Sequence, residues 1–130
     1  MCSRYYTLFM PQAGLSFGNY VRQCREKLKA RDAAFSVRQV AGRVGIEPAY
    51  LSKIERNEMP PPGEETICRL ASELDMDADL LLAMAGKVSS DLRAIIMRRP
   101  RLFADLIRQL KSAPDHAILR IVRQVSDGNW

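Results

Sequence analysis

Residues 36–57 read SVRQVAGRVGIEPAYLSKIERN, and this stretch is the most informative part of the sequence. Ser36 followed by Gln39 has the spacing of a capping box, which satisfies backbone N–H groups at the start of a helix. Gly45 suits the left-handed conformation in which many helices end. Pro48 suits the first position of a second helix, where its missing N–H is not needed. The stretch therefore predicts two short helices joined by a sharp turn.

Apolar residues within this stretch are spaced so that the two helices can face each other. Ala41 is small enough to let the second helix approach closely. The larger apolar residues would form the wedge between the helices: Val40, Val44, Ile46, Leu51 and Ile54. Each residue is uninformative alone, but together and in register they are typical of a helix-turn-helix.

The rest of the chain also follows the helical period, with a possible strand signal only at residues 4–10. A first helix is predicted over residues 16–31, and the proline-rich segment 60–63 is predicted to be a stiff loop. Further helices are expected from Glu64 to Leu74, from Asp77 to Ala85, from Ser89 or Ser90 to the residue before Pro100, and around two apolar stripes at 102–110 and 118–125. We therefore expect an all-α protein.

The pattern divides the chain into three parts: an N-terminal arm (1–15), a helical domain (16–87) and a C-terminal helical extension (88–130). The apolar patch near the start has no basic region of any size before it, so it is not interpreted as a signal peptide. No apolar run approaches the length of a membrane span. We expect a cytoplasmic protein.

Few residues suit catalysis or metal binding. Cys2, Cys24 and Cys68 are an odd number without close pairing, and His116 is the only histidine. This pattern does not favour a metal site, and free thiols suit a reducing cytoplasm. The chain also lacks a glycine-rich phosphate loop and a recognisable pair of catalytic carboxylates. We expect neither an enzyme nor a cofactor-binding protein.

The net charge of +5 is unevenly distributed along the sequence. Residues 22–56 hold nine Lys and Arg against four Asp and Glu, residues 57–91 hold two against eight, and residues 92–130 hold eight against three. Such segregation can direct one basic face toward a polyanion. The alternative is that these charged runs only keep a helix face solvated.

Residues 17–86 resemble the domain shared by phage repressors, Cro proteins and Xre-type regulators. The resemblance rests on SVRQVAGRVG, on AYLSKIERN with a proline-rich loop after it, and on ICRLASELDMDADLLLA. It implies a five-helix, lambda-repressor-like DNA-binding domain, here followed by about three further helices. It also implies that the helix 48–56 enters the major groove of double-stranded DNA and that the protein binds as a homodimer.

The base-reading candidates are the residues that project away from Leu51 and Ile54, and they are Glu47, Ala49, Tyr50 and Lys53. Ala49 can meet a thymine methyl group, and Lys53 can donate to guanine. Tyr50 can contact a base edge or a phosphate. Glu47 can accept from cytosine, although it can equally be a charge that favours the helix N-terminus.

The candidates for phosphate contacts surround the two helices, and they are Ser36, Arg38, Gln39, Arg43, Ser52 and Arg56. For Arg38 and Arg43 the alternative is a solvated helix face. The resemblance further implies a structural ion pair between Arg25 and Glu55 that ties the first helix to the third.

Three features depart from the family pattern. Val37 stands where the family usually has Gln, and this removes one expected contact with the phosphate backbone of DNA. Asn57 replaces a usual Gly, although Asn tolerates the left-handed conformation. The link KARDAAF at residues 29–35 is longer than typical, which predicts a longer first helix or a bulging loop.

The C-terminal stripes are the predicted dimerisation surface, formed by Leu102, Phe103, Leu106, Ile107, Leu110, Ile118, Ile121, Val122 and Val125. Alternatively, they pack onto their own domain as additional core. The function expected is a sequence-specific transcriptional regulator, more specifically a repressor. The alternative is an antitoxin-like module, or one from a phage or restriction system, whose C-terminal helices bind a second protein. A small-ligand sensor remains open but is not required by any residue.

Overall fold

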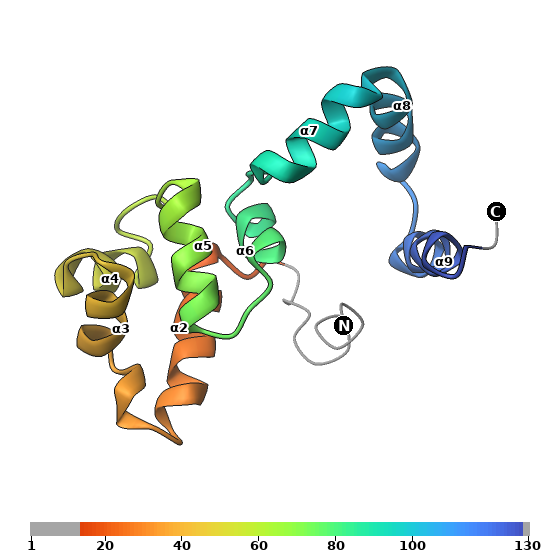
Figure 1. The fold of residues 1–130 in the computed structure, drawn as a ribbon. Helices are drawn as coiled ribbons and strands as arrows, with labels where there is room; N and C mark the ends of the chain where they lie inside the picture. The colour runs from red at the N-terminus through yellow and green to blue at the C-terminus, as the bar shows by residue number, and fades with distance from the viewer. Residues whose placement is uncertain (1–13, 129–130) are drawn as a thin grey trace. The chain divides into compact units, whose positions relative to one another are not determined.

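The structure is a computed structural model that describes residues 14–128. Across these residues it contains eight α-helices, one short 3-10 helix and no strand, which confirms the all-α prediction (Figure 1). The strand considered at residues 4–10 lies outside the described residues. The chain divides between Ser89 and Ser90 into two compact units.

The first unit contains six helical segments. They are α2 (Phe17–Lys29), η1 (Ala33–Phe35), α3 (Val37–Val44), α4 (Pro48–Glu55), α5 (Glu64–Glu73) and α6 (Ala78–Met84). Helix α4 packs against both α2 and α3, and α5 packs against α3 and α6 (Figure 1).

Local signals at both ends explain the length of α2. The Ser16 side chain caps the helix by accepting from the Asn19 N–H at 3.1 Å, as serine commonly does at this position. The helix ends at Lys29, two residues earlier than predicted. It ends there because the extra residues of the link form the 3-10 helix η1. The start of η1 is capped by the Asp32 side chain, which accepts a hydrogen bond from the Ala34 N–H at 2.9 Å. The long link is therefore a short 3-10 turn.

The structure contains the predicted cap at the start of α3 and the predicted turn between α3 and α4. The Ser36 hydroxyl oxygen accepts from the Gln39 N–H at 3.2 Å. The N–H of Ser36 donates to the Ala33 carbonyl instead of completing a capping box, because η1 directly precedes the cap. Gly45 is left-handed at φ 88°, and Pro48 occupies the first turn of α4.

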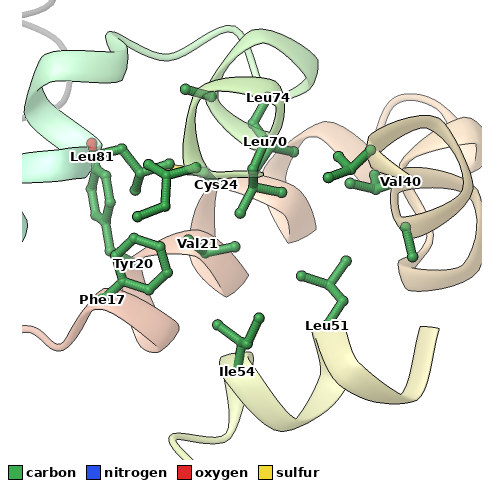
Figure 2. Close-up of a cluster of buried hydrophobic side chains, with 14 of the residues drawn as sticks. Phe17, Tyr20, Val21, Cys24, Val40, Leu51, Ile54, Leu70, Leu74 and Leu81 are labelled. Atoms are coloured by element: carbon green, nitrogen blue, oxygen red, sulfur yellow. The ribbon is translucent and has the colours of Figure 1, made fainter. Parts of the chain in front are cut away.

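The helices of the first unit enclose one apolar core (Figure 2). Four members of the predicted wedge are fully buried, with Val40 and Leu51 at 0% and Val44 and Ile54 at 1% exposure. Ile46 is only partly buried at the edge of this core. Each fully buried aliphatic side chain stabilises a fold by about 1.5–3 kcal/mol. The core therefore holds α4 rigidly in place.

A glycine determines how closely α2 and α4 pack. A Cβ atom added at Gly18 would collide with the carbonyl oxygen of Ile54 and would lie 2.7 Å from Oδ1 of Asn57. Asn57 itself is left-handed at φ 63°, and its Nδ2 donates to Oδ1 of Asn19 at 3.2 Å. The last turn of α4 thus rests directly on the first turn of α2.

The second unit has three helices, α7 (Ser90–Arg98), α8 (Pro100–Leu110) and α9 (Asp115–Ser126). None of residues 90–128 is buried. The large apolar side chains that remain exposed in this unit are Leu92, Ile95, Met97, Leu102, Leu106, Ile107, Ile121, Val122 and Val125. This unit is helical but has no core of its own.

Candidate nucleic-acid interface

Helix α4 has one face toward the core and one toward the surface. Leu51, Ile54 and Glu55 are buried on its inner face. Ala49 and Lys53 are exposed on the other side, and Glu47 is exposed just before the helix begins. Because residues four apart lie on the same helix face, Ala49 and Lys53 form one outward ridge. The structure thus places three of the four base-reading candidates at the surface.

Tyr50 differs from its expected position. It is half-buried and packs against the core of the first unit, whereas the sequence pattern predicted that it projects away. The neighbouring Leu51 is fully buried, so the side of α4 that carries Tyr50 borders the core. Tyr50 therefore contributes to packing, and less of it is available to a ligand than of Ala49 or Lys53.

The start of α3 carries three of the phosphate candidates. Arg38 and Gln39 are exposed, and Ser36 is half-buried because its hydroxyl group caps the helix. No acidic residue lies in the first turn of α3. Helix N-termini attract anions through their free N–H groups and the helix dipole. Ser36, Arg38 and Gln39 are thus brought together at one end of α3.

Arg43 is engaged by its own domain. Its Nε donates to Oε2 of Glu73 at 2.7 Å, and its guanidinium carbon lies 5.2 Å from the centre of the Phe35 ring. Both interactions link α3 to other segments of the domain. Neither the phosphate role nor the solvated-face alternative included these partners, and Glu73 is thirty residues away in the sequence.

The remaining phosphate candidates are Ser52, within α4, and Arg56, which caps its C-terminal end. Arg56 is exposed, and its Nε donates to Oε2 of Glu58 at 2.6 Å. This hydrogen bond raises the pKa of Arg56 and lowers the pKa of Glu58. Ser52 is half-buried on α4. A phosphate group at Arg56 would have to compete with Glu58.

A buried ion pair holds α4 against α2. Arg25 donates from Nε to Oε2 of Glu55 at 2.7 Å and from Nη2 to Oε1 at 2.8 Å. The two side chains are only 3% and 4% exposed, and Arg25 also donates to the Phe35 carbonyl oxygen at 3.2 Å. The hydrogen bonds to Glu55 raise the pKa of Arg25. This is the pair that the family resemblance implied.

The sequence pattern did not identify four residues that contact the predicted site residues or α4, and they are Gly18, Phe35, Glu58 and Glu73. Only Gly18 had a detectable signal, because glycine is unfavourable within a helix and often marks a close approach of another backbone. Val37, which replaces the usual Gln, is half-buried and packs against the core. The Val37 side chain therefore contributes to the packing of the domain and offers no polar group that could bind a phosphate.

Two cysteines, Cys24 and Cys68, lie among the described residues, and neither is in a disulfide. Burial raises the pKa of the Cys24 thiol, and desolvation also raises that of Cys68. Both thiols therefore stay protonated at neutral pH. Among residues 14–128, no three His, Cys, Asp or Glu side chains are grouped so that they could hold a metal ion. Over the same range, no helix combines the length and apolar character needed to cross a bilayer.

Comparison with known proteins agrees with this geometry. Residues 16–84 match the family model of the helix-turn-helix domain. The match begins at the residue that caps α2 and ends at the last residue of α6. No curated protein and no solved structure matches the chain.

Proposed function

The chain belongs to the helix-turn-helix domain family, and from this premise we propose that it is a sequence-specific transcriptional regulator of the phage repressor and Cro type. In this proposal α4 is the recognition helix and reads the major groove of double-stranded DNA. The protein has no catalytic role and acts as a repressor by occupying its site.

The observation that carries the proposal is the two-sided character of α4. Its inner face is anchored by Leu51, Ile54 and Glu55, while Ala49 and Lys53 remain exposed. Eight residues form a rod of about 12 Å, and the major groove, about 12 Å wide, admits an α-helix. A rigid helix with an outward ridge is the arrangement that base reading requires.

Within this proposal each surface residue has a defined task. Lys53 donates to guanine O6 or N7, Ala49 contacts a thymine methyl, and Glu47 accepts from cytosine N4. Tyr50 makes a smaller contribution because it is half-buried.

Phosphate contacts are divided between free and engaged residues. Arg38 and Gln39 are exposed at the start of α3 and can contact the backbone directly. Arg43 and Arg56 do so only by exchanging Glu73 and Glu58 for a phosphate oxygen. We assign the principal backbone contact to the N-terminal end of α3.

Homodimerisation completes the proposal, because one short helix offers little surface for a specific site. The apolar stripes of α8 and α9 are the proposed pairing surface, and half-sites then lie about one turn of DNA apart. In the full-length chain, Leu106→Asp is expected to abolish the dimer in light scattering. The control Leu92→Asp lies on α7, outside these stripes, and should leave it intact. A Leu106→Asp chain that still dimerises contradicts this surface.

Selection of bound sites from random duplex DNA tests the central proposal. We expect enrichment of a two-fold symmetric site whose halves are about 10 base pairs apart. The purified chain is then titrated with the enriched site and with a scrambled duplex at about 0.15 M salt. Failure to enrich any sequence, together with equal affinity for both duplexes, contradicts sequence-specific recognition.

A protein-interaction module is the second candidate function, and the second unit, which has no buried core of its own, favours it. No residue from 90 to 128 is buried, although several large apolar side chains lie there. In this role α8 and α9 bind a different protein and DNA binding is secondary. A chain that is monomeric in light scattering and selects no DNA site would favour this candidate.

A further inference from the structure

The junction between α7 and α8 carries a dense positive charge. Arg98 is in the last turn of α7, Arg99 immediately precedes α8, and Arg101 is in its first turn. All three are exposed. Three guanidinium groups thus lie within four consecutive residues, with only Pro100 between them. We call Arg98, Arg99 and Arg101 the arginine corner.

The arginine corner is not neutralised by its own chain. Within residues 14–128 none of its three guanidinium groups has a carboxylate at ion-pair distance. Asp105, one turn after Arg101, pairs with Arg108 at 2.9 Å. The first turn of α8 contains no acidic residue. The charge of the corner therefore faces solvent.

Local stability does not explain this arrangement. Basic residues at the start of a helix oppose its dipole, whereas acidic residues there would be favourable. Adjacent like charges also repel one another. Arg98 and Arg99 adjoin the C-terminal end of α7, where the dipole favours a cation, but Arg99 also precedes α8 and Arg101 is in its first turn, where the dipole disfavours one. The dipole therefore does not account for all three arginines together, which points to a partner that supplies negative charge.

We propose that the arginine corner is a second DNA contact, which binds backbone phosphates. This inference rests on the proposed function and extends it to the C-terminal unit. Duplex DNA carries one negative charge per about 1.7 Å of helix axis, so a compact group of three arginines can meet neighbouring phosphates. Arginine also binds phosphate oxygens with two N–H groups at once. Such contacts raise affinity without reading sequence.

The test compares two triple variants of the full-length chain that remove equal charge. In one, Arg98, Arg99 and Arg101 are replaced by Gln. In the control, Lys111, Arg120 and Arg123 are replaced by Gln; these residues are also exposed and lie in the same unit. A third variant, with lysine at 98, 99 and 101, keeps the charge. Circular dichroism and light scattering check helix content and oligomeric state before binding is measured.

Fluorescence anisotropy is measured over a range of salt with the selected site and with a scrambled duplex, both with about 10 flanking base pairs. The corner variant should weaken binding to both duplexes by the same factor, about 10- to 100-fold. It should also flatten the slope of log K against log salt by about 0.9 for each phosphate that the variant no longer neutralises. The control variant should change both quantities much less, and the lysine variant should retain most of the slope.

Each other result overturns the inference. Equal losses in the corner and control variants would indicate a general effect of net charge. An unchanged corner variant would show that the corner does not touch DNA, and a loss confined to the selected site would indicate base reading. A change in oligomeric state would assign the arginines to dimerisation. If the wild-type chain binds the selected site more tightly than the scrambled duplex, and the corner variant has the same affinities as the wild type, only this inference fails. If the wild type has equal affinity for both duplexes, the proposed function fails.

Discussion

The two units of this chain are built from similar amphipathic helices but bury their apolar residues very differently. The first unit encloses fifteen buried apolar side chains in one core, whereas residues 90–128 include no buried residue at all. Helical periodicity therefore identifies the apolar face of a helix but does not indicate whether another segment buries that face. A segment of about 40 residues rarely builds a sufficient core alone, and this is the physical reason for which we propose a pairing surface on α8 and α9.

Removal of Arg25 should have the largest effect on the first unit. Arg25→Ala leaves the buried carboxylate of Glu55 without its partner, which should lower the free energy of unfolding by about 3–5 kcal/mol. Urea denaturation followed by circular dichroism measures this loss. Arg22→Ala is the matched control, because Arg22 makes an exposed pair with Glu26 and should cost less than about 1 kcal/mol. Similar losses in both variants would contradict the structural role of the buried pair.

The same leucine truncation in each unit compares them directly. Leu51 is 0% exposed and Leu102 is 67% exposed. Leu51→Ala should cost about 2–5 kcal/mol because it opens a cavity in the core. Leu102→Ala should change the unfolding free energy of the first unit by about 0.5 kcal/mol or less. A large effect of Leu102→Ala on that transition would show that the second unit supports the first.

Gly18→Ala tests the contact between α2 and the end of α4. The added methyl group meets the Ile54 carbonyl oxygen, so the helices must separate, and the expected loss is about 1–3 kcal/mol by urea denaturation. Gly42→Ala is the control because no atom lies within 4 Å of a Cβ built there. It should be neutral or stabilising, since alanine favours helices over glycine by about 1 kcal/mol. A stabilising Gly18→Ala would mean that the helices are not closely packed.

Lys53→Ala should leave stability almost unchanged, because the side chain is exposed, but it should weaken binding to the selected site. The expected loss is about 1–3 kcal/mol if Lys53 donates to a base. Anisotropy with site variants should show relaxed preference at one position. Arg38→Ala, which removes a phosphate contact, should instead weaken all sequences alike. An unchanged preference in Lys53→Ala would exclude base reading by that residue.

Residues whose partners are close in sequence were predicted accurately. Ser36 caps α3, Gly45 is left-handed and Pro48 opens α4, because each effect depends on the backbone of a few neighbouring residues. The helix-turn-helix assignment followed from these signals and is confirmed by the family match. The Xre and Cro type, the repressor role and the dimer stay predictions.

Residues whose partners are distant were predicted less well. The sequence pattern predicted that Tyr50 projects outward, but its side chain packs against the core and is half-buried. Arg43 was assigned to phosphate or solvent, yet Glu73 engages it from thirty residues away. Such partners cannot be derived from periodicity, because they depend on how α3 and α5 approach in space.

The amino-acid sequence alone determined which segments form helices, which of their faces are apolar, and that residues 36–57 form a helix-turn-helix. These properties arise from local backbone preferences and from side chains within one or two turns. Tertiary packing was needed to establish that α4 rests directly on Gly18, that Arg25 and Glu55 are buried together, and that six large apolar side chains of α8 and α9 stay exposed. Those outcomes depend on the contacts of segments far apart in the chain, where packing and not propensity determines the arrangement.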